Sequence, residues 1–215
     1  MMEPTEHNLR AWEEAHRRRA AAPSHDRPGL PDQVRRALGD LTGKRVLHLG
    51  SGTGAGTAEL AERGAVVTGV DLEGEALDAA RERWPSILWV EADPQALPTE
   101  LRRGRFDLVY AGGGGLDGLD DLEGWARGIA SALRLRGELL VFDEHPAAVR
   151  VDALMRWHHD YFAGPPRLGQ LVTALAHAGL VTRALEEYPS PPGNPRRHDR
   201  RIPGEFLLYA DKEAR

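Results

Sequence analysis

With 215 residues and 41% hydrophobic content, the chain has the size of one domain with additions. Its net charge of −5 argues against a protein that binds the phosphate backbone of nucleic acids, and the lack of cysteine excludes disulfides and cysteine-ligated metals. No apolar run approaches the length of a membrane span, and the N-terminus shows no signal-peptide core. We therefore expect a cytoplasmic protein, monomeric or homodimeric, with neither a nucleic acid nor a membrane as partner.

Residues 1–40 are polar and rich in arginine, and we expect them to form a helical cap. Short helices are predicted near 6–20 and 32–39, separated by a run that begins and ends with proline. From residue 45 onward, short apolar runs alternate with helical segments. This pattern predicts strands over 45–49, 65–71, 87–90, 106–110 and 138–142, and helices over 57–63, 75–84 and 120–137.

The last third of the chain begins with an aromatic, histidine-rich stretch, which we interpret as an insertion at about 143–166. A helix follows, and then two strands over 180–188 and 205–210 with no helix between them. Such a pair suits a hairpin, so the last strand is expected to be antiparallel. Residues 41–215 thus predict an α/β fold with a doubly wound, seven-stranded, mostly parallel sheet and helices on both faces.

A glycine-rich turn follows the first predicted strand. Gly50, Gly52 and Gly54 allow a sharp turn and a close approach of backbone to ligand, and Asp71 lies 21 residues after Gly50. At that spacing an open α/β sheet places a carboxylate against a ribose. A nucleoside-containing cofactor is therefore predicted. The glycines fit both a dinucleotide-binding pattern, with Ala55 as its last residue, and the pattern that binds S-adenosylmethionine (SAM).

Three features favour SAM over a dinucleotide. None of the four tyrosines has a lysine four residues later, as a short-chain dehydrogenase needs. Asp93 lies just beyond the third strand, where its carboxylate either accepts a hydrogen bond from an adenine amino group or is the N-cap of a helix that begins at Pro94. The final pair of strands without a helix is foreign to the six-stranded dinucleotide fold.

At this point the chain resembles the class I SAM-dependent methyltransferases, in particular their small-molecule branch. The matching segments cover about half of the chain in the order of that family: VLHLGSGTG (46–54), VTGVDLEGEALDAAR (67–81), VEADPQALP (90–98), FDLVYAG (106–112) and GELLVFDEHP (137–146). The resemblance implies a Rossmann-like fold, SAM as cofactor and S-adenosylhomocysteine as product. It further implies methyl transfer to an O, N or C atom of a small molecule without a metal. A non-methylating SAM-binding protein and an NAD(P)-dependent oxidoreductase remain alternatives.

The resemblance also implies which residues surround the cofactor. The turn Gly50, Ser51, Gly52, Thr53 and Gly54 would approach the methionine part and the ribose. Asp71 would hold the ribose hydroxyls and Leu72 would pack on the adenine. The remaining contacts would come from Ala92, Asp93 and Pro94 at the adenine and from Tyr110 and Ala111 near the sulfonium. One departure stands out: His48 occupies the position where the family usually has an acid that orients the amino end of the cofactor.

Two histidines are candidate catalytic bases, because a neutral imidazole suits proton removal near pH 7. His145 follows the fifth strand, although it could equally shape a turn. His16 shares a helical face with Trp12 in the predicted N-terminal helix, which could instead be a solvated helix. Trp157 and Tyr161, in the insertion, are candidate substrate-binding residues or ordinary packing groups. No metal ligands are predicted.

Overall fold

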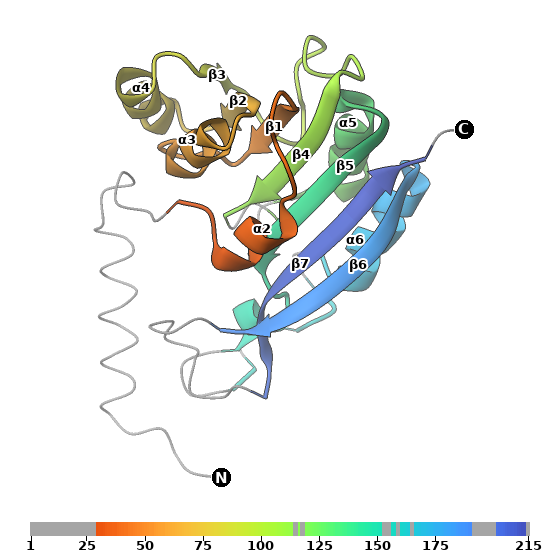
Figure 1. Cartoon of the computed structure of the whole chain (residues 1–215). Coiled ribbons are helices and arrows are strands. Elements are labelled where there is room, and N and C mark those ends of the chain that lie inside the picture. Colours follow the sequence, from red (N-terminus) through yellow and green to blue (C-terminus); the bar gives the residue numbers. More distant parts are fainter. Residues whose placement is uncertain are drawn as a thin grey trace, which may run out of the picture.

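Seven strands form one sheet in the order β3-β2-β1-β4-β5-β7-β6 (Figure 1). The computed structural model describes residues 29–113, 116, 119–151, 156–157, 160–163, 166–190 and 201–213. The strands are β1 (Arg45–Leu49), β2 (Val66–Asp71), β3 (Leu88–Glu91), β4 (Phe106–Gly112), β5 (Leu133–Glu144), β6 (Leu180–Pro189) and β7 (Pro203–Lys212).

Only β7 runs against its neighbours. The pairs β1–β2, β2–β3, β1–β4 and β4–β5 are parallel, whereas β7 is antiparallel to both β5 and β6. The sheet thus ends in the β6–β7 hairpin that the missing helix predicts. The predicted Rossmann-like α/β class, with a mostly parallel sheet and an antiparallel last strand, is confirmed.

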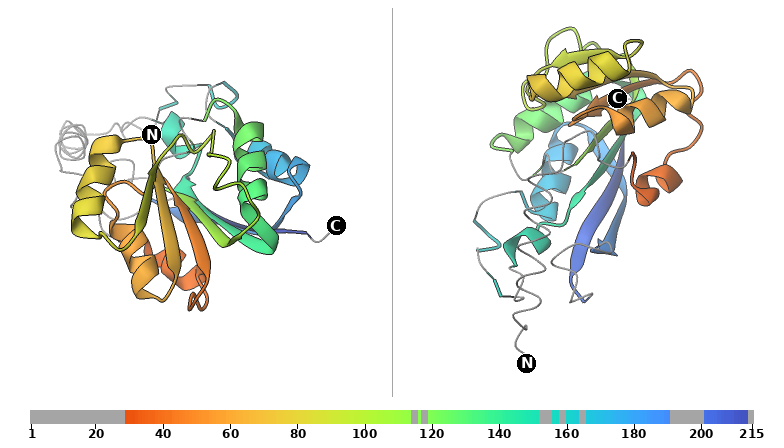
Figure 2. Two further views of the ribbon diagram at one scale, coloured as in Figure 1. Left: turned by 90° about the horizontal axis from the view of Figure 1, so that it is seen from above. Right: turned by 90° about the vertical axis from the view of Figure 1, so that its left-hand side faces the viewer.

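Helices cover both faces of the sheet, as the view from above shows (Figure 2). They are α2 (Asp32–Ala37), α3 (Ala55–Glu62), α4 (Gly74–Arg83), α5 (Leu122–Ala132), α6 (Leu168–His177) and the short 3₁₀ helix η3 (Ala148–Arg150). One buried cluster joins α5 and α6 to the sheet, and a second joins α2 and α3 to the opposite face. Since side chains of a strand alternate between faces, odd and even positions of β1 and β5 enter different clusters, as do those of β4 from Leu108 onward.

The boundary between α5 and β5 differs from the prediction. The helix was expected to continue to Gly137, but it ends at Ala132, and β5 starts at Leu133. Leu133 pairs with Phe106 of β4, and a register shift follows before the regular ladder resumes. Leu133 is fully buried, so it satisfies both the helical repeat and the strand. Periodicity alone therefore could not locate this boundary.

The insertion and the N-terminal segment are described only in part. β5 extends to Glu144, two residues into the predicted insertion, and η3 follows it. Beyond η3, Val151 and Trp157 form an isolated antiparallel bridge. The predicted helix over 32–39 is present as α2, whereas the one over 6–20 lies outside the described residues.

Candidate functional site

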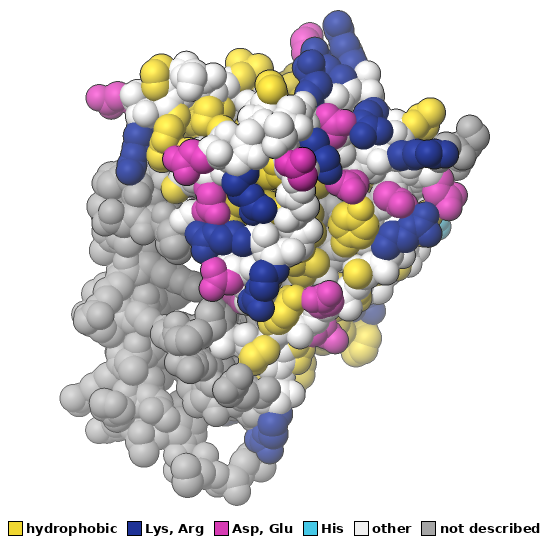
Figure 3. Space-filling view, viewed as in Figure 1, with side chains coloured by type: hydrophobic (Ala, Val, Ile, Leu, Met, Phe, Trp, Pro, Cys, Tyr) yellow, Lys and Arg dark blue, Asp and Glu magenta, His cyan; other side chains and the backbone are white. Residues whose placement is uncertain are grey.

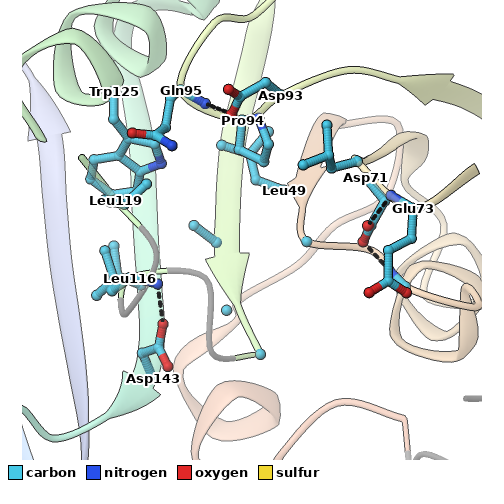
Figure 4. Close-up of a pocket in the computed structure, with 17 residues that line it drawn as sticks. Leu49, Asp71, Glu73, Asp93, Pro94, Gln95, Leu116, Leu119, Trp125 and Asp143 are labelled. Carbon is cyan, nitrogen blue, oxygen red and sulfur yellow. Dashed lines mark hydrogen bonds between the residues drawn. The ribbon is translucent and has the colours of Figure 1, made fainter. Parts of the chain in front are cut away.

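A cavity of about 490 Å³ opens at the carboxyl ends of the central strands (Figure 4). This is where open α/β sheets bind ligands, and the volume is within the range of small-molecule sites. Seven of the predicted cofactor residues line it: Gly50, Gly52, Asp71, Leu72, Asp93, Pro94 and Ala111. The fold therefore brings together residues from β1, β2, β4 and the loop after β3.

The glycine turn after β1 forms one side of the cavity. Gly50 has a φ of 74°, and a Cβ atom there would lie 2.8 Å from the carbonyl oxygen of Gly112 at the end of β4. The two strand ends thus approach each other too closely for any residue other than glycine at position 50. Gly54 serves packing instead, because a Cβ atom at that position would lie 2.6 Å from the ring of Trp89.

Asp71 fixes the turn to the end of β2. Its Oδ2 accepts a hydrogen bond from the Gly52 N–H at 2.6 Å, and its Oδ1 accepts one from the Glu73 N–H at 3.0 Å. Leu72, which lies between Asp71 and Glu73 in the sequence, is 64% exposed and lines the cavity. Exposed apolar surface beside a carboxylate suits a nucleoside, whose base is flat and whose sugar carries hydroxyls.

Asp93 caps a turn and not the predicted helix, because no helix begins at Pro94. Its Oδ1 accepts a hydrogen bond from the Gln95 N–H at 2.8 Å, while the residue also lines the cavity (Figure 4). Gln95 in turn accepts hydrogen bonds from the backbone N–H groups of Asp120 and Asp121, just before α5. The loop after β3 and the start of α5 are thereby joined along one side of the cavity.

Asp143 is the acidic residue of β5 that lines the cavity and that sequence reasoning missed. It is the penultimate residue of β5, lies on the same face of the strand as Val141, and is 5% exposed. Its Oδ2 accepts a hydrogen bond from the Leu116 N–H at 3.0 Å and its Oδ1 one from the Glu144 N–H at 2.7 Å (Figure 4). The available signal was a carboxylate directly after the predicted strand over 138–142, two residues before His145.

The other lining residues that were not predicted are mostly apolar or small. They come from segments far apart in the sequence, so no local pattern could have grouped them. They are Leu49, Glu73, Gln95, Gly112, Gly113, Leu116, Leu119, Trp125 and Val141.

His48 and Tyr110 lie on the opposite face of the sheet from the cavity. The Nδ1 atom of His48 is 2.8 Å from the hydroxyl of Thr57 in α3, and its ring stacks on Tyr110 with centroids 4.7 Å apart. Burial lowers the pKa of His48 to about 4, so the ring is neutral at pH 7. Burial likewise raises the pKa of Tyr110. Neither residue lines the cavity.

Four further predicted cofactor residues do not line the cavity either: Ser51, Thr53, Gly54 and Ala92. Ser51 and Thr53 are buried within the turn itself. Ser51 and Thr53 contribute to the shape of the turn. For all four residues, a contact with the cofactor stays a prediction.

His145 is buried beside β6 and does not line the cavity. Its Nε2 lies 2.8 Å from a carboxylate oxygen of Glu187, and its Nδ1 accepts a hydrogen bond from the Ala147 N–H at 3.1 Å. Burial lowers the pKa of His145, and Glu187 opposes this effect. The predicted turn-shaping contact is present, and the catalytic role stays a prediction.

Trp157 and Tyr161, the predicted substrate-binding residues of the insertion, lie away from the residues that line the cavity. Trp157 is 61% exposed, and its ring meets Tyr161 edge-on with centroids 6.3 Å apart. Neither ring lines the cavity. His16 and Trp12 lie outside the described residues.

Charged side chains of both signs are interspersed over the face shown in Figure 3. Among the described residues, no three His, Asp or Glu side chains gather closely enough to hold a metal ion. Within the same part of the chain, no helix has the length and apolarity needed to cross a membrane.

Known proteins resemble this chain in sequence and in fold. A family model described as a methyltransferase domain matches residues 46–137. Demethylmenaquinone methyltransferase of Tropheryma whipplei is 28% identical over 181 residues, which span 82% of this chain and 67% of that protein. Magnesium-protoporphyrin O-methyltransferase of Rhodobacter capsulatus is 52% identical over 49 residues, but these cover only 23% of this chain and 22% of that protein.

A solved structure of a SAM-dependent methyltransferase from Mesorhizobium loti superposes with a TM-score of 0.71. It is 24% identical in sequence, and the match covers 84% of this chain and 96% of that one. At this identity the superposition establishes the shared fold.

Proposed function

We propose that this chain, which belongs to the class I SAM-dependent methyltransferases, moves a methyl group from SAM to an O, N or C atom of a small molecule. The observation that carries the proposal is the pairing of the glycine turn with Asp71 at the mouth of the cavity. Relatives named for small-molecule methylation support the acceptor class. No metal takes part in the proposed reaction.

The residues present fit SAM. Gly50 and Gly112 line the cavity with bare backbone, so a ligand can approach the main chain closely there. Asp71 can hold the ribose hydroxyls, Leu72 can cover the adenine, and Asp93 and Pro94 lie beside the base. When bound, SAM supplies an electrophilic methyl group on sulfur. The protein then needs to align the acceptor in line with that bond and to exclude water.

The expected binding partner, cellular location and oligomeric state are part of the same proposal. The net charge of −5 and the interspersed surface charges support a small molecule over a nucleic acid as partner. A cytoplasmic location and a monomeric or dimeric state remain predictions from the sequence.

Calorimetric titration separates this function from its two alternatives. We expect S-adenosylhomocysteine to bind with micromolar affinity and NADH not to bind. Binding of NADH alone would establish the oxidoreductase. Binding of SAM without methyl transfer to any acceptor tested would indicate a non-methylating member of the fold.

Asp71→Ala is expected to weaken the binding of S-adenosylhomocysteine by at least about tenfold. The substitution removes the proposed ribose contact and both hydrogen bonds that hold the turn, and hydrogen bonds to charged groups contribute about 1.5–3 kcal/mol each. Asp107→Ala is the matched control, because Asp107 also accepts a backbone hydrogen bond but at the opposite end of the sheet. Equal affinities of both variants would contradict the assignment.

His145→Ala is expected to lower turnover by at least roughly tenfold if the imidazole is the general base. Glu187→Gln keeps the ring but removes the charge that opposes the lowered pKa, so it should shift the pH–rate profile to lower pH. A structural role would instead lower the melting temperature and leave turnover and its pH profile unchanged. That outcome would remove His145 from the reaction.

A further inference from the structure

We propose that the indole N–H of Trp125 donates a hydrogen bond to a ring nitrogen of the adenine base, N1 or N7, next to the amino group of the base. The inference rests on the proposed function, since it assumes SAM in the cavity. It adds a residue of helix α5 to the base contacts, which the sequence pattern sought only at the ends of β2 and β3.

Trp125 carries a hydrogen-bond donor that no other described residue uses. The residue is 2% exposed, and it lines the cavity. Its Nε1–H has no hydrogen-bond partner among the described residues, yet the atom is not enclosed, unlike the unpaired Oγ of Ser51. An indole N–H can only donate, and when it is buried it usually has a partner. This donor is therefore available to a ligand in the cavity.

The loop after β3 and the first turn of α5 hold Trp125 close to the expected position of the base. The side-chain oxygen of Gln95 accepts hydrogen bonds from the backbone N–H groups of Asp120 and Asp121, at 2.8 and 3.0 Å. Trp125 lies one turn further along α5, where its backbone N–H donates to the Asp121 carbonyl oxygen at 2.9 Å. The backbone N–H of Gln95 in turn binds the carboxylate of Asp93. Figure 4 accordingly shows Trp125, Gln95 and Asp93 along the same edge of the cavity.

The loop after β3 offers the base few donors of its own. Pro94 lines the cavity but has no N–H. Within residues 92–96, all of which the structure describes, only the backbone N–H of Asp93 is not donated to another group of the protein. The other N–H groups are donated by Ala92 to the Asp71 carbonyl oxygen, and by Gln95 and Ala96 to the carboxylate and the carbonyl oxygen of Asp93.

The chemistry of adenine suits an acceptor and a donor placed side by side. Its amino group donates hydrogen bonds, and the nearby ring nitrogens N1 and N7 accept them. The Oδ2 atom of Asp93 makes no hydrogen bond to a described residue and can accept one from the amino group. The Trp125 N–H can then donate to the neighbouring ring nitrogen. Two strand spacings, about 10 Å, separate β2 from β4, against which Trp125 packs, so a base attached to a ribose at Asp71 can reach the indole.

The test measures calorimetric affinities for S-adenosylhomocysteine and for three analogues in which N1, N3 or N7 is replaced by C–H, which cannot accept a hydrogen bond. For the unaltered protein, we expect the 1-deaza or the 7-deaza analogue to bind at least about tenfold more weakly than the parent ligand. In Trp125→Phe the parent ligand should lose at least about tenfold in affinity, whereas that analogue should lose less than twofold. The 3-deaza analogue is the control ligand, because N3 lies away from the amino group. Its affinity relative to the parent should rise in Trp125→Phe only because the parent binds more weakly.

Trp89→Phe is the matched control variant. The indole N–H of Trp89 donates to the Trp84 carbonyl oxygen at 3.1 Å, and the residue does not line the cavity. The same chemical change should therefore leave the ratios between parent and analogue affinities as they are in the unaltered protein. Unaltered ratios in Trp125→Phe as well would overturn the inference, because the indole would then only fill space. If the unaltered protein does not bind S-adenosylhomocysteine, the proposed function itself fails.

A second measurement uses the unaltered protein and does not depend on the folding of a variant. The chain has five tryptophans, whose indole N–H signals can be followed in ¹⁵N-labelled protein. At saturation with S-adenosylhomocysteine, we expect one indole signal to lie at lower field than at saturation with the weakened deaza analogue, because only the parent ligand accepts its hydrogen bond. Identical indole signals with both ligands would contradict the proposed contact.

Discussion

Gly50→Ala is expected to weaken the binding of S-adenosylhomocysteine by at least about 100-fold and to destabilise the fold by roughly 2 kcal/mol. The left-handed conformation at φ 74° costs a residue with a Cβ atom about 1–2 kcal/mol. The added methyl group would also lie 2.8 Å from the Gly112 carbonyl oxygen, and neither a Cβ atom nor a backbone oxygen can rotate out of such a contact. The ends of β1 and β4 must then separate, which deforms the floor of the cavity.

Gly43→Ala separates the cost of the left-handed conformation from the effect of the close contact with Gly112. Gly43 has nearly the same φ, 71°, but its Cβ atom would meet nothing within 4 Å, and the residue is remote from the cavity. We expect this control to lose about 1 kcal/mol in urea denaturation and to keep its affinity in calorimetry. If Gly50→Ala behaved like Gly43→Ala, the close approach of the two strand ends would have no role in binding.

Acidification is expected to destabilise the protein through His48 by roughly 3 kcal/mol. The pKa of His48 is lowered from 6.5 to about 4 in the folded protein because the ring is buried. Between these two values the unfolded chain binds a proton at His48 and the folded chain does not. The stabilisation is therefore fully present above pH 6.5 and is lost as the pH falls toward 4.

His48→Gln removes this titration while keeping a side chain that can hydrogen-bond to Thr57. The free energy of unfolding of both proteins should be measured in urea at pH 7 and at pH 4.5. Other groups titrate equally in both, so the difference between them isolates His48. We expect the variant to be less stable at pH 7, because the stacking on Tyr110 is lost, and to lose less stability on acidification. Parallel pH dependences would show that His48 is protonated in the folded protein.

Several parts of the site follow from the sequence because they are local. The glycine turn and the position of Asp71 beside it depend on residues within one strand–helix–strand unit, where spacing translates directly into position. The antiparallel end of the sheet also follows, since two strands without a crossover helix pair as a hairpin. The predicted boundary between α5 and β5 was wrong, because the buried Leu133 fits both the helical repeat and the alternation of a strand.

The face on which each strand residue lies was decided only by the tertiary structure. His48 and Tyr110 belong to segments that resemble a cofactor site, yet the pleat turns them toward α3, while Asp143 of β5 faces the cavity. A shift of one residue in the pairing of a strand would move each of its side chains to the other face of the sheet. Which face carries the cavity depends on how α5 and Leu116 pack against the sheet. The sequence by itself determined the sheet, the turn and the class of cofactor, because those depend on order and spacing along the chain. The set of side chains that meet in the cavity depends on packing between distant segments, and only the folded structure specifies it.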